Sequence, residues 1–118
     1  MRKRVFSLIT LLCFALAVVA AGKRFTLVID AGHGGGDNGA PGAYSNEKDL
    51  TLKYALAFGR YVERNCPDVK VIYTRTTDIF VTLAGRADIA NRNKADLFLS
   101  FHINAITGSK SAHGFQSW

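Results

Sequence analysis

The stretch that decides the fold is LVIDAGHGGGDNGAPG, residues 27–42. An apolar run ends at Asp30, and His33 follows almost at once in a loop that is rich in glycine. The apolar run and the residues just before it predict a buried strand. The loop itself allows three interpretations, which are a phosphate-binding loop, a metal site and a plain turn. The rest of the sequence has to distinguish them.

Strand-like and helix-like segments alternate along the chain, which indicates βαβ units and a mainly parallel sheet flanked by helices. We therefore expect an α/β fold with three layers. The first helix should begin at Asn46, with Asp49 as its capping-box partner, and end at the RNCPD segment because proline cannot continue it. Its apolar face should consist of Leu50, Tyr54, Ala57 and Tyr61, with Leu52, Leu56 and Val62 beside it. The predicted strands are residues 24–30, 69–75 and 95–105, and the second helix is predicted at residues 82–93.

A further strand is predicted at residues 115–118, where the sequence stops. A sheet that stops inside a strand leaves an open edge, which complete domains usually cover. We therefore expect residues 22–118 to be the N-terminal part of a larger α/β domain, with its later strands and helices missing.

Residues 1–21 have the pattern of a secretory signal peptide. Three cations precede an apolar run at residues 5–17, and small residues lead up to a cleavage site before Gly22. An uncleaved membrane anchor is the alternative, but the run is short for a span of ~20 residues. We expect an exported protein, in the periplasm or at the cell wall, with no stable membrane span once the signal peptide has been removed.

Charge and cysteine content exclude several classes of protein. Loss of residues 1–21 lowers the net charge from +6 to +3, which is too small to indicate nucleic-acid binding but suits a polyanionic cell wall. Cys66 is the only cysteine in residues 22–118, so the fold has no internal disulfide. The sequence contains no clear signal for an oligomeric state.

The phosphate interpretation rests on the pattern G-x-G-x-x-G at residues 34–39, directly after a strand, and on Arg75 at the end of the next one. In a dinucleotide-binding fold the helix begins within the glycine run. Here Pro41 and several other residues come first, and Asp37 would place a negative charge among the phosphates. We therefore disfavour this interpretation.

The metal interpretation joins His33 to Glu47 and His102. The carboxyl ends of parallel strands open into one crevice, and these residues lie just after the first strand, at the start of the following helix and near the end of the third strand. Two imidazoles and one carboxylate form an open zinc site. Each residue also has a simpler explanation, as a turn histidine, a first-turn acid favoured by the helix dipole and a core histidine.

Five segments resemble the successive motifs of the zinc-dependent N-acetylmuramoyl-L-alanine amidases, which are bacterial cell-wall hydrolases with an α/β fold. The resemblance runs from about Phe25 to Ala105 in the family's order and spacing, and continues weakly into AHGFQSW. The segments are IDAGHGGGDNGA (29–40), NEKDLTL (46–52), VIYTRTTD (71–78), LAGRADIAN (83–91) and ADLFLSFHINA (95–105).

The resemblance implies that His33, Glu47 and His102 bind Zn²⁺. It also implies that the substrate is peptidoglycan, cleaved by zinc-activated water at the amide between N-acetylmuramic acid and L-alanine. The family's general base is a glutamate in a late strand, which would lie beyond Trp118. Glu63 cannot replace it, because sixteen residues of helix separate it from Glu47 by ~24 Å. We therefore expect this chain to bind zinc better than it hydrolyses substrate.

Arg75, Asp78, Arg86 and Asn91 also match family positions, and we expect them to brace loops and helix ends, without a catalytic role. Two other hypotheses remain open at this point. One is a non-catalytic fragment that binds zinc and the cell wall, and the other is a partial reading frame with no stable fold.

Overall fold

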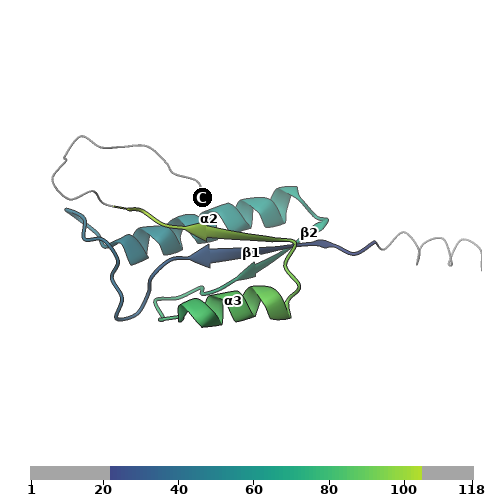
Figure 1. The fold of residues 1–118 in the computed structure, drawn as a ribbon. Coiled ribbons are helices and arrows are strands. Elements are labelled where there is room, and N and C mark those ends of the chain that lie inside the picture. Colours follow the sequence, from purple (N-terminus) through teal and green to yellow (C-terminus); the bar gives the residue numbers. More distant parts are fainter. Residues whose placement is uncertain (1–21, 105–118) are drawn as a thin grey trace, which may run out of the picture.

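A computed structural model of the chain describes residues 22–104, as three strands and two helices that alternate along the sequence (Figure 1). The predicted signal peptide and the predicted strand at residues 115–118 lie outside this range. The elements are β1 (Phe25–Ala31), α2 (Glu47–Asn65), β2 (Val69–Tyr73), α3 (Leu83–Arg92) and β3 (Leu97–Phe101).

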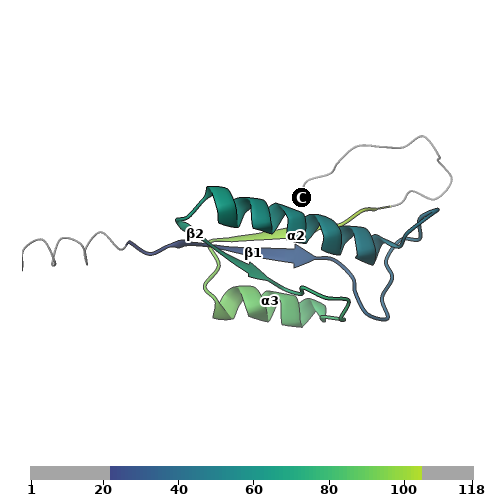
Figure 2. The ribbon, with the colours of Figure 1, turned by 180° about the vertical axis from the view of Figure 1, so that it is seen from behind.

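The three strands form a parallel sheet in the order β2-β1-β3, so β1 lies in the centre. Val28 of β1 aligns with Ile72 on one side and with Phe98 on the other. Helix α2 covers one face of the sheet and α3 covers the other (Figures 1 and 2). The predicted three-layer α/β arrangement is therefore confirmed.

The core lies mainly between β1 and α2. Leu27, Ile29 and Ala31 project from one face of β1 and pack with Ala55 and Val62 of the helix. Val28, on the opposite face of the strand, is also fully buried. A central parallel strand that is buried on both faces has a continuous apolar run, here residues 27–29, which is why a strand could be predicted at residues 24–30.

The predicted apolar face of α2 is wrong, although two residues predicted beside it do contribute to the core, Val62 within it and Leu52 packed against it. Tyr54 and Tyr61 are exposed, whereas the side of the helix that faces the sheet contains small residues such as Ala55 and Gly59. A Cβ atom on Gly59 would come within 2.5 Å of the Tyr73 ring, so the helix approaches β2 through a position without a side chain. Close approach through small residues replaces the broad apolar stripe that the sequence suggested. The buried residues of α2 are Glu47, Thr51, Ala55, Gly59 and Val62.

The element ends mostly agree with the predictions. The Asp49 side chain accepts a hydrogen bond from the Asn46 backbone N–H at 3.3 Å at the start of α2, and Thr82 caps α3 by accepting from Gly85 N–H at 3.0 Å. Strand β3 is shorter than predicted and ends at Phe101. His102 is therefore the first residue after the strand.

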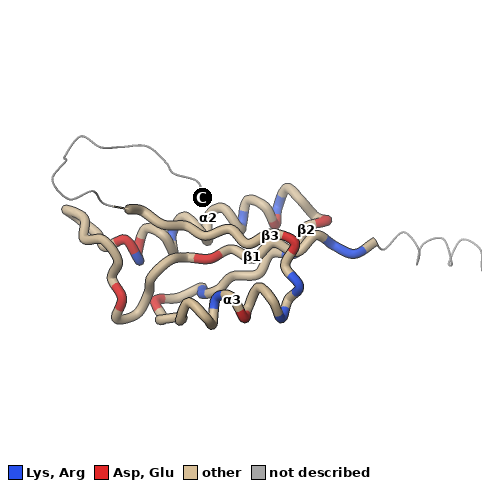
Figure 3. The backbone as a smooth tube through the Cα atoms, in the orientation of Figure 1, with Lys and Arg blue, Asp and Glu red and all other residues tan. Residues whose placement is uncertain are grey.

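Charged residues of both signs are spread over the loops and helices (Figure 3). Within residues 22–104, no helix combines the length and the apolar character that are needed to cross a membrane.

The carboxylate of Asp30 in β1 connects the two neighbouring strands of the sheet to α3. Asp30, which is 2% exposed, accepts hydrogen bonds from the hydroxyls of Thr74 and Ser100, both at 2.6 Å. Arg86 of α3 donates to the same carboxylate at 2.5 Å, and its guanidinium is buried too. Side chains that follow β2, lie on β3 and lie on α3 therefore meet at a single residue of β1.

We expect Asp30→Asn to lower the free energy of unfolding by about 3–5 kcal/mol, because removing one partner leaves the charge of Arg86 buried and unpaired. The control is Lys23→Ala, which breaks the exposed Lys23–Asp96 ion pair (2.8 Å) and should change the free energy of unfolding very little, because water screens exposed pairs. Urea unfolding of the parent and the two variants at pH 7 measures both values. Equal losses in the two variants would contradict the central role of Asp30.

The same comparison should depend on pH. Burial by itself would raise the pKa of Asp30, but the hydrogen bonds from Ser100, Thr74 and Arg86 outweigh it and lower the pKa below its ordinary value of 3.8. The stabilising contribution is therefore complete above pH 3.8 and is lost as the pH falls through the lowered value. The stability difference between the parent and Asp30→Asn should shrink in that acid range, and a constant difference there would disprove the assignment.

Candidate metal centre

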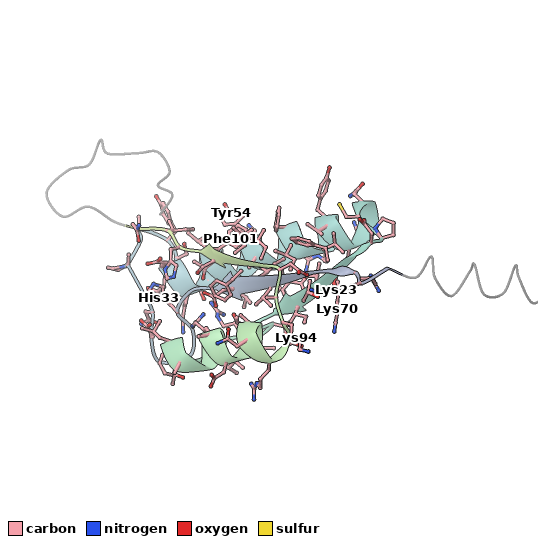
Figure 4. All side chains as sticks on the ribbon, turned by 45° about the vertical axis from the view of Figure 1, so that its right-hand side comes forward. Lys23, His33, Tyr54, Lys70, Lys94 and Phe101 are labelled. Carbon is pink, nitrogen blue, oxygen red and sulfur yellow. The ribbon has the colours of Figure 1, made fainter. Side chains whose placement is uncertain are left out.

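Three separate elements bring the predicted ligands to one edge of the sheet. His33 lies in the loop after β1, Glu47 is the first residue of α2 and His102 directly follows β3. Figure 4 shows His33 at the end of the sheet opposite Lys23 and Lys70. This is the edge formed by the carboxyl ends of the parallel strands, where the sequence placed all three residues.

The three side chains form a compact group. One ligand atom from each lies within 4.8 Å of the others. Nε2 of His33 is 3.2 Å from one carboxylate oxygen of Glu47, and Nδ1 of His102 is 3.2 Å from the other. The two imidazole rings meet edge to face, with their centroids 4.9 Å apart. This donor set fits a divalent metal ion, because three bonds of about 2 Å can converge from these positions.

Glu47 is held in its charged form although it is only 4% exposed. Its carboxylate accepts backbone hydrogen bonds from Ala40 N–H at 2.8 Å and from Ile103 N–H at 2.7 Å. Burial would raise the pKa of Glu47, but these two donors and the nearby His33 outweigh it and lower the pKa. Glu47 thus joins the loop before α2 to the segment after β3, and it presents a negative charge between the two imidazoles.

The loop that carries His33 has a constrained backbone. His33 has a φ of 61°, in the left-handed region that residues other than glycine rarely occupy. Arg86 donates to the carbonyl of His33 at 2.9 Å, and Arg75 donates to the carbonyl of Gly32 at 2.9 Å. Buried guanidinium groups therefore hold the peptide groups on both sides of this conformation.

A second pair of charged residues holds the tip of the loop. Asp78 accepts from Gly35 N–H at 2.8 Å, and Lys48 donates to the Gly35 carbonyl at 2.7 Å. Lys48 and Asp78 also form an ion pair of 2.9 Å. The predicted bracing role of Arg75, Asp78 and Arg86 is therefore confirmed.

The structure argues against the phosphate interpretation. Arg75 donates to the backbone carbonyls of Ala31, Gly32, Thr77 and Lys48 and to the Thr51 hydroxyl, so its guanidinium is already occupied by the protein. The glycine loop also leads to α2 only at Glu47, as the sequence indicated.

Sequence reasoning missed two features of the site. Gly32 is one, because a Cβ atom there would come within 2.6 Å of Nε2 of His102, so only glycine lets that ring lie against the strand end. Asp37 is the other, since its carboxylate lies 2.9 Å from Nδ1 of His33. That hydrogen bond, together with one from Gly39 N–H, lowers the pKa of Asp37. The i,i+4 spacing of a histidine and an aspartate within one loop was the available signal.

Fold and side chains together define a class, namely α/β proteins with two histidines and one carboxylate grouped at the carboxyl edge of a parallel sheet, close enough together to hold a metal ion. The sequence profile of the N-acetylmuramoyl-L-alanine amidases matches residues 27–118. The chain therefore belongs to the N-acetylmuramoyl-L-alanine amidase family.

Individual relatives agree with this membership. The chain is 41% identical over 92 residues to the sporulation-specific N-acetylmuramoyl-L-alanine amidase of Bacillus subtilis, in an alignment that covers 78% of this chain and 34% of that protein. The catalytic domain of CwlV from Bacillus (Paenibacillus) polymyxa is similar at 38% identity and a TM-score of 0.70, over 75% of this chain and 49% of that one. An N-acetylmuramoyl-L-alanine amidase of Clostridium difficile 630 gives 37% identity and a TM-score of 0.73, over 79% and 50%. The chain thus spans about a third to a half of these proteins.

Two glycines of the same loop allow a matched test of the packing at His102. We expect Gly32→Ala to displace the His102 ring and to weaken divalent-metal binding by at least ~10-fold, as loss of ligand support typically does. Gly36→Ala should leave binding unchanged, because a Cβ atom there meets nothing within 4 Å. Titration of both variants with a metal-sensitive dye measures the two affinities. Equal effects at the two positions would show that His102 does not need this close approach.

Proposed function

We propose that this chain carries the zinc-binding part of a peptidoglycan amidase, and that His33, Glu47 and His102 are the metal ligands. The observation that carries the proposal is the convergence of the three side chains around a buried carboxylate held in its charged form. Family membership supports the same conclusion independently.

Zinc is the metal that this donor set favours. Two imidazole nitrogens and one carboxylate oxygen form an open site for Zn²⁺, which keeps a fourth position for water or substrate. When bound, the ion would acidify a water molecule and polarise the carbonyl of a scissile amide. The relatives' names supply the substrate, which is the amide between N-acetylmuramic acid and the L-alanine of the stem peptide.

The chain's own residues prepare this site before any substrate arrives. Glu47 is ionised and fixed by two backbone donors, so it supplies charge without reorientation. His33 presents Nε2 and His102 presents Nδ1 toward it. Ligands held in place in this way lose little conformational entropy when they bind an ion.

A carboxylate must also accept and return a proton during amide hydrolysis. Among the described residues, Asp37 is bonded to His33 and Gly39, and Glu63 lies beside the Tyr73 hydroxyl at 3.5 Å. We therefore place the proton acceptor outside residues 22–104. A chain in which no carboxylate fills this role should turn over substrate ~10²- to 10⁴-fold more slowly.

The same observation favours a second candidate function, a non-catalytic fragment that binds zinc and the cell wall. Both candidates place the protein outside the cytoplasm with peptidoglycan as its partner. Residues 1–21 would then direct export, and residues 22–118 would form the N-terminal part of the catalytic domain.

Zinc content of the purified 118-residue chain, with His102→Ala and Lys70→Ala alongside, tests the metal site. We expect about one zinc per chain in the parent, as in mononuclear sites, and much less in His102→Ala. Lys70→Ala, at the opposite end of the sheet, should bind as the parent does. A folded parent without zinc would refute the proposed function.

Incubation of the same samples with purified sacculi separates the two candidates. Chelator-sensitive release of stem peptides by the parent, absent in His102→Ala, would identify an active amidase. Sedimentation of the zinc-loaded chain with sacculi, without peptide release, would identify the binding fragment.

A further inference from the structure

The two ring nitrogens of His33 face different carboxylates. Nε2 lies 3.2 Å from Glu47, on the side where the proposed ligands converge. Nδ1 lies 2.9 Å from Oδ2 of Asp37, on the other side of the ring. Only the contact with Asp37 has the geometry of a hydrogen bond, and a carboxylate can only accept one. A neutral imidazole carries a single proton, so in the neutral ring that proton belongs on Nδ1.

Asp37 is itself held in place. Its second carboxylate oxygen accepts from Gly39 N–H at 3.1 Å. Its backbone exchanges two hydrogen bonds with Gly34, at 2.9 and 3.1 Å, which closes the loop immediately after His33. A Cβ atom on Gly39 would come within 2.6 Å of the His33 ring, so this turn also limits where the ring can lie.

We propose that Asp37 is a positioning residue for metal binding, which fixes the tautomer and the orientation of His33 so that the lone pair of Nε2 points to the metal. This inference rests on the proposed function, because it assumes that His33 is a ligand. A carboxylate behind a ligating histidine also makes the imidazole a stronger donor, and loss of such a partner typically weakens metal binding 10–100-fold.

Two other roles for Asp37 fit the geometry less well. As a stabilising ion pair it would contribute little, because its side chain is 48% exposed and water screens exposed pairs. As a proton acceptor it would have to leave both His33 and Gly39, and it lies on the side of the ring opposite Glu47. The exposure of Asp37 makes the proposal testable, since its loss should affect metal binding without unfolding the chain.

The test compares Asp37→Ala and Asp37→Asn with Asp88→Ala in the full 118-residue chain. Asp88→Ala removes the same charge from an exposed position on α3 and serves as the matched control. Zinc affinity is measured by competition with a chelator, and thermal unfolding of the metal-free proteins reports on the fold. The ¹⁵N chemical shifts of the His33 ring report the tautomer of its neutral imidazole in the metal-free protein. They are identified by their absence in His33→Gln.

We expect Asp37→Ala to bind zinc 10–100-fold more weakly than the parent, with an unchanged unfolding midpoint. Asp37→Asn retains a carbonyl oxygen that can accept from Nδ1–H, so it should recover part of the affinity. Asp88→Ala should bind as the parent does. The parent should show the proton on Nδ1 of His33, and Asp37→Ala should lose this preference, because Glu47 beside Nε2 is then the only carboxylate next to the ring.

An Asp37→Ala variant that binds zinc within about twofold of the parent, while His33→Gln does not bind, would overturn the positioning role and leave the metal site intact. If the folded parent binds no zinc, the proposed function fails. The tautomer of His33 then decides whether Asp37 orients this ring. A single Nδ1–H tautomer that depends on Asp37 would support it, and a mixture in the parent would overturn it.

Discussion

The buried carboxylate of Asp30 is the point on which the described structure depends. It is the only residue of β1 that reaches a partner after β2, a partner on β3 and a partner on α3 through one side chain. Burying a charge is costly unless it is paired and hydrogen-bonded, and Asp30 meets both conditions. Because the buried guanidinium of Arg86 pairs with this carboxylate, the same contact helps to fix the position of α3 against the sheet.

Arg86 extends this arrangement from the core to the site. The guanidinium that pairs with Asp30 also donates to the carbonyls of Ala31 and His33. His33 occupies a backbone conformation that costs free energy, and such strain persists only where the surroundings enforce it. Here the enforcing groups are the two arginines and the Lys48–Asp78 pair, all outside the proposed metal shell. The stability of the sheet and the geometry of the loop are therefore coupled through one buried ion pair.

The sequence was most informative where a single physical rule dominates. A central parallel strand is largely apolar on both faces, so the strand predicted at residues 24–30 was recognisable. Strand ends meet at one edge, so His33, Glu47 and His102 could be grouped. It was least informative where packing depends on the absence of side chains. The buried face of α2 could not be read from apolar spacing, because Gly59 and Ala55 create the contact by being small. Asp37 was missed for a different reason, because its i,i+4 spacing from His33 in a loop indicates a contact only once the backbone of the loop is known.

Metal binding and turnover make different demands on this chain. The three proposed ligands lie between residues 33 and 102, and each is supported by groups within the described residues, either through direct hydrogen bonds or, for His102, through close packing against Gly32. The two aspartates of the surrounding loops are already hydrogen-bonded, Asp37 to His33 and Gly39, and Asp78 to Gly35 and Lys48. The proposed zinc site can therefore have all its protein ligands in place while catalysis still requires a proton acceptor. The separation follows from geometry, because the braces that orient the ligands act on the loop and the strand ends, whereas proton transfer requires a carboxylate on the open side of the metal.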